Sequence, residues 1–114
     1  MNYRSTFIYQ RVLELVTLAR QVIANLPKGH SHLADQLRRA SSSIALNFAE
    51  GHDKGSLKEQ RRYFRIARGS AQEVAAIFDV ADRFGAITSN HYAAGQQLID
   101  HIVRMLFRFR RHAA

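Results

Sequence analysis

Apolar residues repeat at spacings of three and four along one central stretch of this chain. The repeat consists of Leu33, Leu37, Ala40, Ile44 and Phe48. A period near 3.6 residues places such side chains on one face of an amphipathic helix. Three other segments show the same period, so the sequence predicts helices at about 6–25, 31–50, 57–84 and 89–110.

Residues that start or stop helices separate these four segments. Pro27 is expected to stop the first helix, and Ser31 is expected to cap the second. Gly51 is expected to end the second helix as its C-terminal glycine. Ser56 and Glu59 have the spacing of a capping box for the third. The remaining boundary residues are Gly85, Ala86 and Ile87, which are expected to form the last turn between helices, and Thr88 or Ser89 as cap of the fourth helix.

Composition narrows the fold to one helical domain. With 114 residues, 46% of them hydrophobic, the chain is long enough to bury one core and too short for two. One proline and six glycines leave little room for a β-rich fold. Short connections make consecutive helices antiparallel. We therefore expect a single all-α domain over residues 1–114, folded as an up-down-up-down antiparallel four-helix bundle.

Apolar residues outside the expected core stripes favour self-association through the bundle faces. Leu13 and Leu18 lie outside the stripe of the first helix, and Leu46 points away from that of the second. Apolar positions of the third helix cover about half of its circumference at about 100° per residue. Loose burial under neighbouring side chains is one explanation, and contact with another subunit is the other. The stripe of the first helix is Ile8, Val12, Val16, Ala19, Ile23 and Leu26.

The net charge favours an acidic partner. Lysine and arginine number 17 against 9 acidic residues, which gives a formal charge of +8 at pH 7. A positive surface of this kind attracts nucleic acid or an acidic protein, although a basic protein can also be merely soluble.

Cations gather on the third helix. Lys58 and Arg61 lie near its start, where positive charge opposes the helix macrodipole. Binding to a phosphate backbone would explain them, and a solvated face is the alternative. Cations near the end of the fourth helix are weaker evidence, because the dipole favours them. Few exposed aromatic residues are expected beside the arginines, which argues against a base-stacking platform. The candidate nucleic-acid-binding residues are Lys54, Lys58, Arg61, Arg62, Arg65, Arg68, Arg104, Arg108 and Arg111.

A second set of polar residues lies on the second and third helices. No histidine stands at a useful helical spacing from them, so a catalytic cluster is disfavoured. Buried polar groups need partners, and a satisfied network between these helices would fix their register. The predicted structural polar core is Ser43, Asn47, Glu50, Ser70 and Glu73.

Motifs for catalysis, cofactors and metals are missing from the sequence. The six histidines form neither a Glu-x-x-His pair nor a His-Glu-x-x-His site. None follows an arginine at the spacing used by small helical HEPN nucleases, and no glycine-rich phosphate loop is present. We expect no enzyme activity, metal or cofactor. The absence of cysteine suits the cytoplasm, and no apolar run resembles a signal peptide or membrane span.

Two motifs resemble a known family. The run from Arg38 to Gly51 reads RRASSSIALNFAEG, and that from Ile66 to Glu73 reads IARGSAQE. Together they resemble the signature of the bacterial four-helix bundle family of 23S ribosomal RNA intervening-sequence proteins, which includes the accessory variability determinant of diversity-generating retroelements. The resemblance covers nearly the whole chain. At Ala45 this chain departs from many relatives, which have proline there, so the kink that proline causes is not implied.

The resemblance implies a non-enzymatic protein. It implies a pentameric ring with affinity for nucleic acid, and a reverse transcriptase as partner for the retroelement relatives. It also implies that Asn47, Glu50, Ser70 and Glu73 belong to a shared structural core. The family name reflects where such genes were found and implies no ribosomal function. We expect a basic oligomeric module that binds nucleic acid through arginine-rich helix faces, with a protein-binding adaptor for an acidic partner as the alternative.

Overall fold

Four long helices make up almost the whole of the described chain. The computed structural model describes residues 2–109, and no strand occurs among them. A short 3-10 turn, η1 (Tyr3–Ser5), precedes α1 (Phe7–Asn25), α2 (Ser31–His52), α3 (Leu57–Arg83) and α4 (Ser89–Arg108). Each helix agrees with its predicted segment to within two residues at either end, and the predicted end of the fourth helix, at 110, lies outside the described residues.

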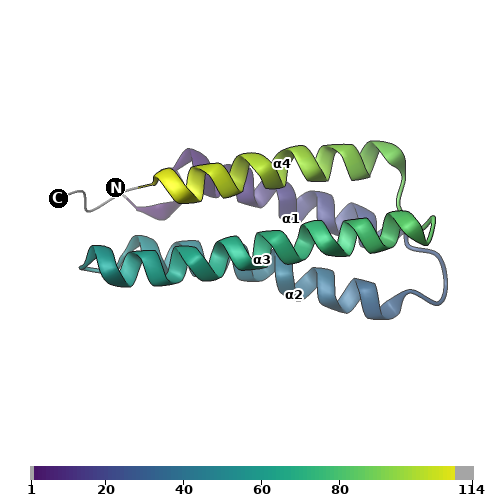
Figure 1. Cartoon of the computed structure of the whole chain (residues 1–114), viewed down its shortest axis with the longest axis horizontal. Coiled ribbons are helices and arrows are strands. Elements are labelled where there is room, and N and C mark those ends of the chain that lie inside the picture. The colour runs from purple at the N-terminus through teal and green to yellow at the C-terminus, as the bar shows by residue number, and fades with distance from the viewer. Residues whose placement is uncertain (1, 110–114) are drawn as a thin grey trace.

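The helices form an antiparallel four-helix bundle (Figure 1). The backbones approach closely between α1 and α2, α2 and α3, α3 and α4, and α4 and α1, while those of the two diagonal pairs lie farther apart. Each helix therefore has two neighbours and one outward face. The predicted all-α, up-down-up-down bundle is confirmed.

Hydroxyl side chains cap three of the four helices. The oxygen atoms of Thr6, Ser56 and Thr88 each accept a hydrogen bond from the backbone N–H three residues on, at 3.1 to 3.2 Å. Such caps satisfy an N–H group that has no partner inside the helix. The prediction that Ser31 caps α2 is wrong, because His30 takes the cap position and makes no side-chain cap bond.

The prediction that Gly51 ends α2 is also wrong. The helix continues to His52, and only Gly29 and Gly85 among the described glycines have positive φ. Gly51 is buried instead, where a Cβ atom would lie 2.8 Å from Cβ of Tyr63. Its lack of a side chain therefore lets α2 and α3 approach closely.

The C-terminus of α3 has the glycine conformation that α2 lacks. Gly85 has φ of 67°, and the N–H of Ala86 donates to the carbonyl of Ala81 at 2.8 Å. The N–H of Gly85 donates to the carbonyl of Asp82 at 3.0 Å. These two bonds form a Schellman motif, which satisfies the last carbonyls of the helix.

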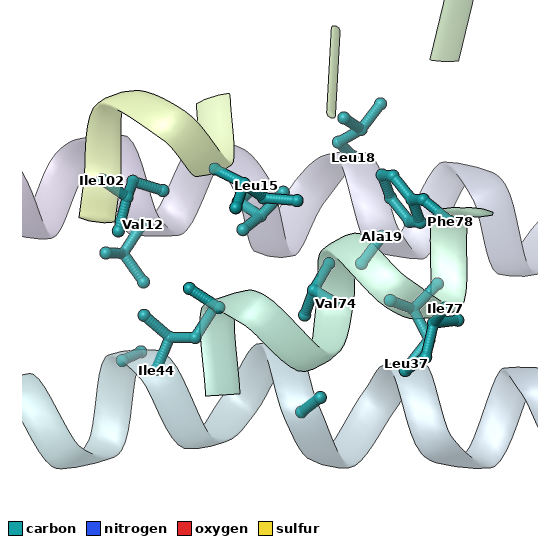
Figure 2. Close-up of a cluster of buried hydrophobic side chains, with 14 of the residues drawn as sticks. Val12, Leu15, Leu18, Ala19, Leu37, Ile44, Val74, Ile77, Phe78 and Ile102 are labelled. Atoms are coloured by element: carbon teal, nitrogen blue, oxygen red, sulfur yellow. The ribbon is translucent and has the colours of Figure 1, made fainter. Parts of the chain in front are cut away.

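The core contains side chains from all four helices, and Figure 2 shows part of it. On α1 the buried arc is wider than the predicted stripe, because this helix packs against both α2 and α4. Leu18 is therefore buried and Leu13 is half-buried, which agrees with the first of the two explanations given for them, burial under neighbouring side chains. Leu46 is 68% exposed, as its position off the stripe predicted. The buried residues of α1 are Ile8, Val12, Leu15, Leu18, Ala19 and Val22.

Candidate nucleic-acid interface

Three arginines of α3 lie beside α4 and line one pocket. Arg61, Arg65 and Arg68 follow a spacing of four and three, which places them on the same side of the helix. The pocket has a volume of about 160 Å³. Its other lining residues are Phe64, Leu106 and Phe107, so no carboxylate contributes to it. We call this site, with its six lining residues, the arginine pocket.

The floor of the arginine pocket is part of the bundle core. Phe64 is 2% exposed and Leu106 is 1% exposed. The ring of Phe64 stacks on that of Phe48 with centroids 5.3 Å apart and planes within 14° of parallel. Aromatic pairs in contact of this kind add stability beyond the area that they bury. A packed apolar floor thus lies beneath the three arginines, between α3 and α4.

Phe107 is the member of the pocket that sequence reasoning missed. Its ring is 57% exposed, and the guanidinium carbon of Arg68 lies 3.9 Å from the ring centroid. This distance is well within the range of a cation–π contact. One exposed aromatic ring thus accompanies the arginines, which weakens the argument from the sequence against a base-stacking platform. The helical pattern did indicate that Phe107 is exposed, since it lies outside the apolar face of the fourth helix. That face includes Ile99, Ile102, Val103, Leu106 and Phe109.

The other predicted cations of the α3 region lie outside this pocket. The ammonium group of Lys54 is 3.1 Å from a carboxylate oxygen of Glu50, and it also lies over the ring of Tyr63 at 5.1 Å from the centroid. Arg62 approaches the same ring at 5.8 Å. The hydrogen bond that Lys54 donates to Glu50 raises the pKa of Lys54 above its ordinary value of 10.5. Lys54 is thus partly neutralised by its neighbour, while Lys58 is exposed.

The predicted cations of the fourth helix are dispersed. Arg104 pairs with Asp100 at 2.9 Å, one turn away on the same helix. Arg108 lines a different pocket, of about 400 Å³, where the ends of α1 and α4 meet. Arg111 lies outside the described residues. Within residues 2–109, by contrast, no carboxylate forms an ion pair with Arg61, Arg62 or Arg65.

The predicted polar core is a smaller network than expected. The side-chain amide of Asn47 donates to the carbonyl and the hydroxyl oxygen of Ser43, at 2.9 and 3.0 Å. The hydroxyl of Ser70 donates to the same Ser43 oxygen at 2.8 Å and so joins α3 to α2. All three residues are half-buried. This hydroxyl-amide network fixes the register of the two helices.

Glu50 and Glu73 do not belong to this network. Both are exposed, and Glu50 pairs with Lys54. The prediction of a buried role for these two carboxylates is wrong, because both positions point outward from the contact between α2 and α3. An exposed carboxylate keeps its hydration, so it needs no protein partner.

The sequence of this chain matches a family over nearly its full length. Residues 4–108 match the family model of the 23S rRNA-intervening sequence protein. The chain belongs to this family. The match includes both motifs that carry the resemblance, and so it includes Ser43 and Ser70. No curated protein matches the chain.

A solved structure has the same fold as this intervening-sequence family member. It is the crystal structure, at 1.70 Å resolution, of a protein with unknown function from the S23 ribosomal protein family of Bacteroides thetaiotaomicron VPI-5482. The TM-score is 0.80 at 20% sequence identity, and the likeness covers 88% of this chain and 94% of that chain. Two proteins with such different sequences therefore share the helical bundle.

The described part of this family member contains neither a metal-binding cluster nor a membrane-spanning helix. No group of three or more histidine, aspartate or glutamate side chains is placed to hold a metal ion there. None of the four long helices is both long and apolar enough to cross a membrane. Among the predicted cations, Arg61, Arg65 and Arg68 share one pocket.

Proposed function

We propose that this protein is a non-enzymatic, oligomeric module that binds nucleic acid through the arginines of α3. One observation carries the proposal: Arg61, Arg65 and Arg68 line a single pocket to which no carboxylate contributes. Guanidinium groups present several N–H donors in a plane, a geometry that matches phosphate oxygens. The arginine pocket thus has the charge and the donors that a phosphate backbone requires.

The arrangement of these arginines is unfavourable for the helix alone. Like charges four residues apart, as at Arg61 and Arg65, destabilise a helix by about 0.2 to 0.5 kcal/mol. Lys58 in the first turn of α3 also opposes the macrodipole. A bound polyanion would offset both effects. The formal net charge of +8 would also attract such a polyanion over a distance.

Self-association would strengthen the binding. Leu46 on α2 and Ile66 and Val80 on α3 are exposed at 68%, 43% and 43%, so the outward side of these two helices carries large apolar side chains. An oligomer that covers them would present one arginine pocket per subunit, and linked weak contacts add to a high overall affinity. The family resemblance favours a pentameric ring, in the cytoplasm, as accessory subunit to a nucleic-acid enzyme such as a reverse transcriptase.

A charge reversal on α3 tests the proposal. We expect a variant with Arg61, Arg62, Arg65 and Arg68 all changed to glutamate to keep its helical content and its mass and to lose binding to duplex DNA and to structured RNA. Gel shift and fluorescence anisotropy at low salt measure the binding. The matched control reverses the same number of exposed charges away from the pocket, at Arg4, Arg20, Arg38 and Arg83.

This control distinguishes binding at the arginine pocket from a general effect of the protein's net charge. Equal loss in both variants would mean that net charge alone governs binding. The parent's affinity should also fall with salt, with a slope of about −0.9 in log affinity against log salt for each phosphate neutralised on duplex DNA. If the parent binds no nucleic acid at low salt, the proposal fails, and an adaptor for an acidic protein becomes the better explanation of the basic face.

A further inference from the structure

We infer that the arginine pocket binds single-stranded nucleic acid, with a phosphate against Arg61 and Arg65 and one unpaired base against the Arg68–Phe107 pair. The inference rests on the proposed function and names the form of nucleic acid that the site takes. It follows from the exposed aromatic ring that α4 adds to the arginines of α3.

The two halves of the pocket differ in chemistry. Arg61 and Arg65 are exposed, and no carboxylate within residues 2–109 pairs with either of them. Their guanidinium groups suit phosphate oxygens. On the other half, Arg68 lies against the Phe107 ring, with 3.9 Å between the guanidinium carbon and the ring centroid. One half therefore favours negative charge, and the other favours a flat polarisable group.

The Arg68–Phe107 pair is suited to a nucleobase. Aromatic rings and guanidinium planes are the two surfaces on which proteins stack unpaired bases. The ring of Phe107 is 57% exposed although Arg68 lies over it, so part of its surface remains accessible. Exposure of a large apolar ring is unfavourable in water, and a stacked base would remove that surface from water.

The size of the pocket argues for one nucleotide unit. Its volume of about 160 Å³ is below the roughly 300 to 1,000 Å³ of ordinary small-molecule sites. Phe64 and Leu106 close its floor, so a ligand cannot enter the bundle. A single base matches this volume, its phosphate would meet the exposed Arg61 and Arg65, and the rest of the strand would follow the outer surface of α3.

Base stacking requires an unpaired base, because the faces of bases in a duplex are already covered by their neighbours. Proteins that read such faces act on single strands, loops and ends. Duplex DNA would still meet Arg61 and Arg65 through its phosphates. We therefore expect binding to both forms, with a preference for single strands that depends on Phe107 and on the planar group of Arg68.

The experiment compares three fluorescently labelled probes of equal length: an oligothymidylate strand, a strand of the same phosphates without bases, and a duplex. The parent should bind oligothymidylate about ten-fold more tightly than the abasic strand, which is within the range found for one stacked base. Phe107→Leu keeps an apolar side chain and removes the ring. It should lose this ten-fold difference and bind duplex as the parent does. Phe84→Leu is the matched control, since Phe84 is 59% exposed at the opposite end of α3.

A second variant separates planarity from charge. Arg68→Lys keeps the positive charge and removes the planar guanidinium, so it should also reduce the preference for oligothymidylate over the abasic strand. Equal binding of these two strands by the parent would overturn the inference while leaving the proposed function intact. An unchanged preference in Phe107→Leu would overturn it as well. If no probe binds the parent at low salt, the proposed function itself fails.

Discussion

The ring of Phe78 lies so close to the backbone of Gly95 that a Cβ atom there would be 2.1 Å from one ring carbon and 2.4 Å from the next. Phe78 belongs to α3 and is fully buried, and Gly95 is a buried residue of α4. The packing of the Phe78 ring against α4 therefore depends on the absence of a side chain at Gly95.

Because of this contact, we expect alanine to have opposite effects on stability at Gly95 and at Gly69, which both lie within helices. Gly95→Ala should lower the free energy of unfolding, because overpacking typically costs about 1 to 3 kcal/mol. Gly69→Ala should raise it by about 1 kcal/mol, because alanine is the better helix former and no atom lies within 4 Å of the new Cβ. Urea unfolding at one fixed protein concentration measures both changes. A gain in stability for Gly95→Ala would show that Phe78 moves aside easily.

The hydroxyl-amide network should contribute to stability through Ser43. Ser43→Ala removes the acceptor used by both Asn47 and Ser70, so we expect a loss of about 1 kcal/mol in the free energy of unfolding. Ser42→Ala is the matched control, since the Ser42 hydroxyl is exposed and bonds only within its own helix, to the carbonyl of Arg38. Equal thermal midpoints for the two variants would contradict the role of Ser43. Glu73→Leu should leave this network unaffected.

Self-association should depend on the outward side of α2 and α3. Light scattering at micromolar concentration should give the parent a mass several times its 13.0 kDa. Within residues 2–109, Leu46 is the most exposed of the large apolar side chains. Leu46→Asp places a charge there, so light scattering should give this variant a lower mass than the parent. Phe7→Asp is the control, because Phe7 is 65% exposed on α1. A parent that stays monomeric at every concentration, or a control that dissociates equally, would contradict the assignment of this face.

The hydrogen bond between Tyr92 and Asp79 should stabilise the protein only below strongly alkaline pH. The Tyr92 hydroxyl donates to a carboxylate oxygen of Asp79 at 2.6 Å, and this bond, more than burial or charge, raises the pKa of Tyr92 above 10.0. A raised folded-state pKa means that the stabilisation is fully present below the unfolded pKa of about 10 and is lost as pH rises through the folded value. Near neutral pH the parent should therefore have a higher melting temperature than the Tyr92→Phe variant. This difference in melting temperature should vanish at alkaline pH. A difference that stays constant would exclude the bond as its cause.

The helices were predictable because their signals are local. The repeat from Leu33 to Phe48 and the caps at Ser56 and Thr88 each depend on residues only a few positions apart. Gly51 was misassigned because the same residue type serves as helix terminator and as site of close approach. Only the position of Tyr63, on another helix, distinguishes the two roles.

The candidate site was predictable only in part, for the same reason. Its three arginines share a face of one helix, so their spacing alone brings Arg61, Arg65 and Arg68 together. Phe107 comes from α4, and its place beside Arg68 depends on the relative position of two helices. Glu50 and Glu73 were assigned to the wrong environment, because a helical period does not say where the boundary between two packed helices falls.

The pocket at which α1 and α4 meet, lined by Phe7 at the start of one helix and Arg108 at the end of the other, shows that the described chain starts and finishes at the same end of the bundle (Figure 1). A short glycine-rich linker across this end would close the chain into a ring. New ends could then be opened between the exposed residues Lys28 and Gly29. Such a circular permutant would keep every pair of neighbouring helices while starting at α2. The arrangement of the helices in the bundle therefore does not require that α1 comes first in the chain.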